Sequence, residues 1–210
     1  MTAPTTLFAV IEAGDLDGLT KLLEQGADVN ALKPTPPHWS PLHEAIETLE
    51  EGGPIEALML LLRRGANVEG GGGDTPLLMA LYRTQPQAVT LLLAAGANPN
   101  VRGPEGDSPL RLCVERGDLA TAATLLRCGA YIGIDEAGGP LGASALGLAS
   151  RRLDLRFMSL LLDWGAQPTV LDADHMTARD RLAARCEENS DAYDRAVALL
   201  DGNLSRSDTG

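Results

Sequence analysis

Aromatic residues are scarce in this chain, at only 3 % of its 210 residues. Hydrophobic residues nevertheless make up 44 % and charged residues 22 %, which is typical of a folded protein and not of a disordered one. A core with so few aromatic rings must be built from Leu, Ala, Val and Ile. Such a core is easier to build by stacking small helices than by forming the core and deep pocket of a conventional enzyme.

Positive charge is also in short supply, with 17 Lys and Arg against 29 Asp and Glu and a formal net charge of −12. Because phosphate binding requires concentrated positive charge, this balance argues against nucleic acid as a direct partner. The net charge is −8 over residues 1–75, zero over residues 76–165 and −4 over residues 166–210. The acidity therefore belongs to the two ends of the chain.

Cysteines and long apolar runs are few as well. The three cysteines, Cys113, Cys128 and Cys186, are odd in number and lack Cys-x-x-Cys spacing, so neither a disulfide framework nor a zinc site is indicated. No apolar run approaches the length that a membrane span needs. The N-terminal segment has no basic region and contains Glu12, which favours mature sequence over a signal peptide. We expect a cytoplasmic protein that does not contact a membrane.

Against these absences stands a repeated pattern. Five Gly-Ala pairs along the chain are each preceded by a pair of leucines, and upstream of each of these five lies a small hydroxyl residue that opens an apolar stretch. The glycines are Gly26, Gly65, Gly96, Gly129 and Gly165, and the hydroxyl residues are Thr5, Ser40, Thr75, Ser108 and Ser144. The spacing between them is 21 positions in four copies and 25 in the second, and a frayed sixth copy runs from Thr177 to Leu200. Such a period is the signature of stacked repeats.

Each copy contains the signals of two short helices. Ser40-Pro41 and Thr75-Pro76 put a capping hydroxyl before a proline at the first helical position, where the missing N–H costs nothing. The caps of the second helices are predicted at Asp15, Asp118 and Asp154. Gly-Ala then ends each second helix with a residue that readily adopts positive φ. Neither helix is long enough to be stable alone, so neighbouring copies must bury its apolar face.

The residues of these copies resemble the ankyrin repeat. The motifs that carry the resemblance are SPLHEA at 40–45, TPLLMA at 75–80, GADVNA at 26–31 and GANPN at 96–100. The resemblance implies an all-α solenoid of antiparallel helix pairs with projecting β-hairpin-like loops, and a concave face formed by the first helices and the loop tips. It implies one domain, 1–201, and the polar residues 202–210 after it are expected to form a disordered tail. The repeats are expected at about 5–39, 40–74, 75–107, 108–143 and 144–176, with a degenerate cap at 177–201.

The chain departs from the family pattern in three ways. Phe8 and Asp180 stand where the family has His, which fits terminal repeats that face solvent on one side. The linkers at 31–39 and 131–143 are longer than the usual turn. The four glycines at 70–73 replace a normal loop tip and predict a flexible one, since no Lys-Ser/Thr pair follows them to make a phosphate-binding loop.

Residues for catalysis or metal binding do not converge in the sequence. His43 occupies the family's motif position, where the resemblance implies a hydrogen bond between neighbouring loops, while His38 and His175 lie in different loops. Ser144 lacks the Gly-x-Ser-x-Gly context of a nucleophile elbow. Cys113 takes the place of a small core residue. We therefore predict a protein without enzymatic activity, cofactor or metal.

The candidate site consists of the positions that the family turns toward a partner. On the first helices the repeat register places there an acidic-to-basic series, namely Glu47, Tyr82, Arg83, Glu115, Arg116, Arg151 and Arg152. The loop tips add Trp39, Arg102 and Asp107. Aromatic side chains dominate interface energies, so Trp39 and Tyr82 are the expected anchors, unless Trp39 packs on the prolines of its own loop. Trp164 is expected to cover the end of an outer helix, and the insertion at 50–54 is either a polar loop or a further partner-specific edge.

These observations predict a protein-binding module that acts by occupying its partner. Masking an enzyme, as an immunity or self-protection inhibitor does, is the simplest output and fits the acidic charge. A passive scaffold or adaptor and a regulator of a transcription factor fit the fold equally well. A non-catalytic subunit of an enzyme, with a site in the loop at 131–143, is the alternative from a different class. The partner is expected to be a protein, and the free chain a monomer.

Overall fold

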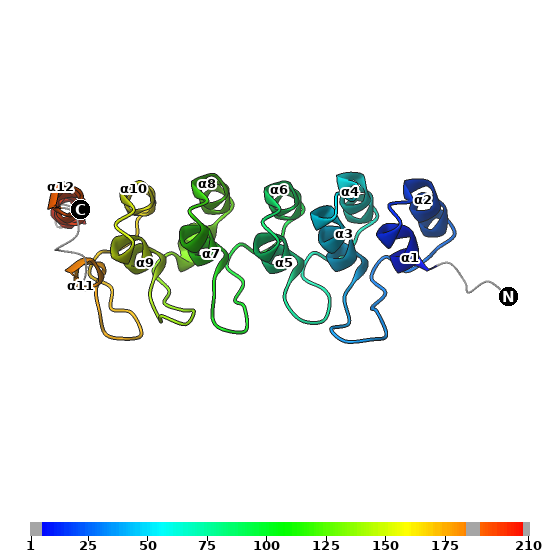
Figure 1. The fold of residues 1–210 in the computed structure, drawn as a ribbon, viewed down its shortest axis with the longest axis horizontal. Helices are drawn as coiled ribbons and strands as arrows, with labels where there is room; N and C mark the ends of the chain where they lie inside the picture. The colour runs from blue at the N-terminus through cyan, green and yellow to red at the C-terminus, as the bar shows by residue number, and fades with distance from the viewer. Residues whose placement is uncertain (1–5, 184–189, 208–210) are drawn as a thin grey trace. The chain divides into compact units, whose positions relative to one another are not determined.

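The computed structural model of the chain describes residues 6–183 and 190–207, and this part is helical, with a single isolated β-bridge between Gly138 and Ala143. Two short helices form each repeat, and the loops project to one side of the helix pairs (Figure 1). The first helices are α1 (Leu7–Glu12), α3 (Pro41–Glu50), α5 (Pro76–Tyr82), α7 (Pro109–Arg116), α9 (Ala145–Arg151) and α11 (Ala178–Ala183). The second helices are α2 (Leu16–Glu24), α4 (Ile55–Arg63), α6 (Pro86–Ala94), α8 (Leu119–Arg127), α10 (Leu155–Asp163) and α12 (Ser190–Ser207), and a 3-10 turn, η1 (Ala130–Gly133), follows α8.

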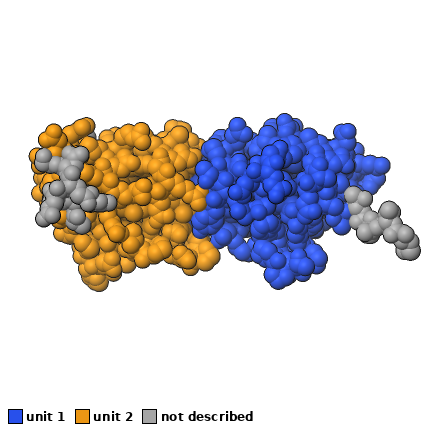
Figure 2. Space-filling view, in the orientation of Figure 1, with its two compact units in different colours: residues 1–101 blue, residues 102–210 orange. Residues whose placement is uncertain are grey.

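Two compact units divide the chain, residues 1–101 and residues 102–210 (Figure 2). In the first unit α1, α3 and α5 pack side by side in one layer, and α2, α4 and α6 in a second. In the second unit α7, α9 and α11 form the corresponding inner layer, and α8, α10 and α12 the outer one. The division falls in the loop between the helix pairs α5–α6 and α7–α8. The single domain 1–201 stays a prediction.

Hydroxyl and carboxylate caps begin the helices as the sequence predicts. The hydroxyls of Thr75 and Ser144 accept from the backbone N–H three residues later, and the carboxylates of Asp15 and Asp118 do the same for second helices. The first repeat begins one residue later than predicted, because the Thr6 hydroxyl accepts from Ala9 N at 3.2 Å. Thr5 lies outside the described residues.

The Gly-Ala pairs end the second helices with a Schellman motif. Gly26 adopts a φ of 86°, its N–H donates to Leu23, and the N–H of Ala27 donates to the carbonyl of Leu22 at 3.0 Å. The same pattern recurs at Gly65, Gly96 and Gly165. The Leu pair and the Gly-Ala pair are therefore two ends of one hydrogen-bonded cap, which explains why they recur together.

Leucine supplies most of the core in both units. Leu58, Leu61 and Leu92 in the first unit, and Leu125 and Leu161 in the second, are fully buried between the two helix layers. The low aromatic content thus has the structural consequence that the composition predicts.

The loop that contains the glycines at 70–73 differs from its prediction. The glycines at 70–73 were expected to form a flexible tip, but they pack against the loop at 31–39, and Gly72 N donates to the carbonyl of His38 at 3.0 Å. A Cβ on Gly71, whose φ is 129°, would collide with the His43 ring, and one on Gly72 would collide with the carbonyl of Pro37. Close backbone approach is therefore the reason for the glycine run.

The C-terminal tail also differs from its prediction. Helix α12 continues through residues 202–207, where a disordered tail was expected, and residues 208–210 lie outside the described part. No Gly-Ala pair or proline follows Leu200, so nothing in the sequence stops the helix there. Ala196 and Leu200 are buried and hold the preceding turns of α12 in place.

Candidate protein-binding site

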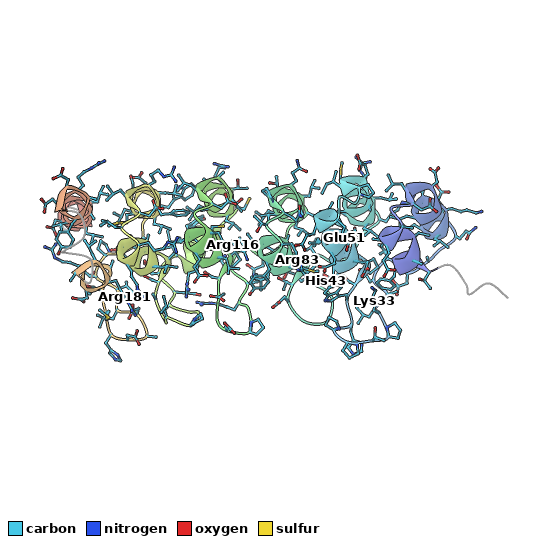
Figure 3. All side chains as sticks on the ribbon, viewed as in Figure 1. Lys33, His43, Glu51, Arg83, Arg116 and Arg181 are labelled. Carbon is cyan, nitrogen blue, oxygen red and sulfur yellow. The ribbon has the colours of Figure 1, made fainter. Side chains whose placement is uncertain are left out.

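A pocket of about 420 Å³ opens in the first unit between the loop at 31–39, the glycine-rich loop and α5. Its lining consists of Pro37, Trp39, His43, Gly73, Asp74, Met79, Tyr82 and Arg83. We call this cavity the Trp39 pocket; Figure 3 labels two of its residues, His43 of α3 and Arg83 at the end of α5. Three residues predicted from the repeat register to bind a partner, Trp39, Tyr82 and Arg83, thus meet in one cavity.

His43 holds the rear of the pocket together. Its Nε2 donates to the carbonyl oxygen of Asp74 at 2.7 Å, and its Nδ1 faces the Ser40 hydroxyl at 2.8 Å and accepts from Ser40 N at 3.3 Å. The ring is buried, and burial lowers the pKa of His43, so the neutral ring is favoured. The predicted loop-to-loop role of His43 is confirmed, and the ring has no free nitrogen left for chemistry.

Asp74 presents a carboxylate oxygen that the described chain does not use. Its Oδ1 is enclosed and has no hydrogen-bond partner there. Trp39 and Tyr82 beside it are half-buried, and Met79 and Pro37 complete an apolar wall. The pocket therefore combines aromatic faces with one unsatisfied acceptor.

Arg83 is held by carboxylates of the neighbouring helix. Its Nε and Nη2 lie 2.8 and 2.9 Å from the two carboxylate oxygens of Glu47, and its Nη1 lies 3.2 Å from Glu50. Two predicted site residues, Glu47 and Arg83, thus pair with each other. The insertion at 50–54 extends α3 far enough to bring Glu50 into this cluster, so its first residue acts in packing between repeats.

Lys33 is held in the same way on the other side of α3. Its ammonium lies 3.0 Å from Glu12 and 2.7 Å from Glu44 (Figure 3). Burial raises the pKa of Glu44, whereas the hydrogen bond from Lys33 keeps the pKa of Glu12 below its ordinary value. Like Arg83, Lys33 is thus flanked by two carboxyl groups.

In the second unit, two of the predicted loop-tip residues, Arg102 and Asp107, contact other residues of the protein. Arg102 pairs with Glu136 and donates to the carbonyls of Gly106 and Ala137, both at 2.9 Å. Asp107 was expected at an exposed loop tip, but only 8 % of its surface is accessible, because its side chain turns inward.

The residue that organises these loops is Arg111, which the sequence analysis did not single out. It is completely buried, donates to Gly138 O, and lies 3.6 Å from Asp107 and 2.6 Å from Glu115. In the motif Ser108-Pro109-Leu110-Arg111 it takes the place that His43 has in the second repeat. An arginine at the motif position of His43 is the sequence signal that could have identified Arg111.

The remaining predicted arginines, Arg116, Arg151 and Arg152, are exposed at the C-terminal ends of α7 and α9. Trp164 forms the C-cap of α10 and stacks on Tyr131 with 6.0 Å between ring centroids. It therefore lies at the end of an outer helix, as expected.

Groups suited to chemistry stay apart in the described residues. These contain no cluster of three His, Cys, Asp or Glu side chains that would hold a metal ion, and no helix long and apolar enough to cross a membrane. Cys113 is buried, and burial raises the pKa of its thiol to about 12, which leaves it unreactive at neutral pH. Cys128 is exposed, and Cys186 lies outside the described residues.

Comparison with known proteins agrees with the repeat geometry. Residues 6–103 match the family of ankyrin repeats, in three copies. An ankyrin repeat domain from Acinetobacter baumannii superposes with a TM-score of 0.79 over 94 % of this chain and 97 % of its own, at 23 % identity. Residues 6–103 are thus ankyrin repeats, and the described chain has the fold of an ankyrin solenoid. Domains with the ankyrin-repeat fold are typically non-catalytic interaction modules that bind proteins.

Two further proteins are similar to this chain, and the similarity covers very different shares of their lengths. The solved complex of a predatory endopeptidase from Bdellovibrio bacteriovorus with an immunity protein contains a similar chain, with a TM-score of 0.71 and 25 % identity over 95 % of this chain and 99 % of that one. The 2-5A-dependent ribonuclease of Mus musculus is 35 % identical over 78 residues, which are 36 % of this chain and 10 % of the ribonuclease. The match thus spans only a tenth of that enzyme.

Proposed function

We propose that this ankyrin-repeat protein binds an enzyme and masks it, as an immunity or self-protection inhibitor does. The observation that carries the proposal is the likeness to a chain from the endopeptidase–immunity protein complex, which extends over 95 % of this chain and 99 % of the other. A likeness over the full length of both chains supports a shared mode of action better than a likeness of a few repeats. The Trp39 pocket supplies a place for the partner to engage.

The chemistry of the described residues supports a mode of action in which the protein occupies a surface of its partner. Repeats make up nearly the whole described chain, and His43 and Cys113, the groups best suited to catalysis by type, serve packing. A binding module of this kind changes its partner by covering a surface. Covering an active site gives inhibition without any chemistry of its own.

Affinity capture followed by an activity assay tests the proposal. The full-length protein is immobilised, proteins from the source organism are captured and identified, and the activity of each captured enzyme is measured with increasing amounts of the protein. We expect one enzyme to lose its activity in a stoichiometric titration. A captured partner that keeps full activity in the complex contradicts masking and favours the scaffold or adaptor. A captured transcription factor or enzyme subunit favours the corresponding alternative.

Two variants locate the interface in the same assay. Trp39→Ala and Tyr82→Ala are each expected to weaken binding by about 2 kcal/mol, roughly 30-fold, because aromatic residues in pockets are common hot spots. Trp164→Ala is the matched control, since Trp164 is also partly exposed but lies at the end of α10. If all three variants bind as tightly as the unmodified protein, the partner does not use the Trp39 pocket.

A further inference from the structure

The Trp39 pocket contains a carboxylate oxygen that receives no hydrogen bond from the described part of the chain. Asp74 Oδ1 is enclosed by protein but receives no hydrogen bond from the described residues. Burying an acceptor without a donor is unfavourable, and more so for a charged group. The backbone carbonyl of Asp74 accepts from His43 Nε2 at 2.7 Å, which fixes the backbone at this point of the pocket wall. A ligand with a donor would relieve this cost.

The charges around the pocket favour a positively charged ligand. His43 contributes no charge, because its burial lowers its pKa. Arg83, the one cationic residue in the lining, already faces both Glu47 and Glu50. With Asp74 included, these groups carry an excess of negative charge. The first unit as a whole adds to it, with 5 basic and 12 acidic residues among residues 1–101.

The walls of the pocket suit the stem and head of a basic side chain. Trp39 and Tyr82 both border the cavity, and a cation over an aromatic face is attracted by the negative potential of the ring. Met79 and Pro37 provide an apolar surface for the methylene groups of a long side chain. The bond from Gly72 N to His38 O joins the two loops before any ligand arrives. The site is therefore formed in advance.

We infer that the Trp39 pocket receives a lysine or arginine side chain of the partner protein, with its stem along Trp39 and Tyr82 and its charged group on the carboxylate of Asp74. An acidic side chain would meet the like charge of Asp74, and an apolar one would cover Oδ1 without satisfying it. The inference rests on the proposed binding function and specifies the chemistry that the partner must present.

Small probes test the pocket independently of any partner. The full-length protein, labelled with ¹⁵N, is titrated with the blocked amino acids N-acetyl-lysine methylamide, N-acetyl-arginine methylamide and N-acetyl-norleucine methylamide. Norleucine has an apolar chain of similar length without the charged head. We expect saturable shifts of the Trp39 indole N–H with the lysine or arginine probe, and at least tenfold weaker binding of the norleucine probe. Equal binding of all three probes, or no shift with either cationic probe, overturns the inference.

Variants of two carboxylates isolate the role of Asp74. Asp74→Asn is expected to weaken binding of the cationic probe at least tenfold, while Asp17→Asn, which removes the same charge from an exposed site on α2, leaves it within twofold. Circular dichroism confirms folding of both, and the probe comparison on the unmodified protein needs neither variant. Equal effects of the two variants overturn the inference.

The outcome separates the pocket from the proposed function. Probes that fail to bind, together with an enzyme that is still inhibited, overturn the pocket assignment and leave the proposed function standing. Probes that bind as expected, together with a captured partner that keeps its activity, uphold the pocket and contradict masking.

Discussion

At the scale of single residues, two repeats use different side chains for the same task. His43 in the second repeat and Arg111 in the fourth occupy the same motif position, and each reaches from its first helix to the loop that follows the second helix of its own repeat. The neutral ring of His43 connects the carbonyl of Asp74 with the hydroxyl and the backbone N–H of Ser40. Arg111 carries a permanent charge and therefore needs Asp107 and Glu115 beside it.

Replacing His43 is expected to destabilise the protein. His43→Ala leaves the carbonyl of Asp74 and the cap at Ser40 without partners in a buried place, and we expect the free energy of unfolding to fall by about 1–3 kcal/mol. The control is His175→Asn, an exposed site with a φ of 59° that Asn tolerates, where the change is expected to stay within about 0.5 kcal/mol. Urea denaturation measures both. Equal stability of the two variants would contradict the role of His43.

The pH dependence of stability provides a second test of His43. Because burial lowers its pKa in the folded protein below the ordinary 6.5, the unfolded chain binds more protons just below that pH. The stability associated with neutral His43 is therefore complete above about pH 6.5 and declines as the pH falls toward the lower folded pKa. We expect His43→Gln to remove this decline, measured as the difference in unfolding free energy between variant and unmodified protein from pH 7.5 to 5. Parallel curves would contradict a lowered pKa.

Arg111 is expected to be the more costly residue to remove. Arg111→Ala leaves Asp107 buried without its counter-charge, and breaking one side of a buried pair costs about 3–5 kcal/mol. Removing both charges in Arg111→Ala/Asp107→Ala is expected to recover part of that loss. Arg127→Ala on the exposed face of α8 is the control, expected within about 0.5 kcal/mol in urea denaturation. No recovery in the double variant would show that packing of the arginine stem, and not charge, accounts for the loss.

At the scale of elements, the end of α4 and the glycine-rich loop after it require glycine for two separate reasons. Gly65 has a φ of 81° at the end of α4, with open space around it, so only its backbone conformation requires glycine. Gly71 combines a φ of 129° with contact against the His43 ring. The first is a feature of every second helix in the family pattern, whereas the second belongs to this loop alone.

Alanine substitutions separate these two reasons. Gly65→Ala is expected to cost about 1–2 kcal/mol from left-handed backbone strain alone. Gly71→Ala adds a collision with a buried ring, and overpacking typically costs about 1–3 kcal/mol more. Thermal or urea unfolding of the two variants gives the difference directly. If Gly71→Ala were as stable as Gly65→Ala, the loop would have room to move away from His43.

At the scale of the whole molecule, the net charge of −12 shapes how a partner approaches. The proposed lysine or arginine on the partner implies a basic contact surface, and opposite charges accelerate encounter between proteins. The screening length falls from about 30 Å to about 3 Å between 0.01 M and 1 M salt.

We therefore expect the association rate constant with the captured partner to fall by about tenfold or more over this salt range, while the dissociation rate constant changes less. Surface-immobilised binding kinetics measures both rates. An association rate that is independent of salt would show that the partner's contact surface is not basic.

The sequence by itself determined the repeats, their helix pairs and their caps, because these depend on local signals within a few residues of one another. Thr75 before a proline, Asp15 before an apolar stretch and Gly26 after a leucine pair each act on the backbone nearby. The same register singled out Trp39 and Tyr82, two residues of one pocket.

Only the tertiary structure decided how the charged residues are used. Arg83 and Glu47 are 36 positions apart and meet because α3 packs against α5, and Asp107 turns inward because Arg111 is buried beside it. The repeat pattern places Asp74 at a loop tip, yet its Oδ1 is enclosed and has no donor among the described residues. Such pairings depend on distances across repeats, which the spacing of residues along one chain does not specify.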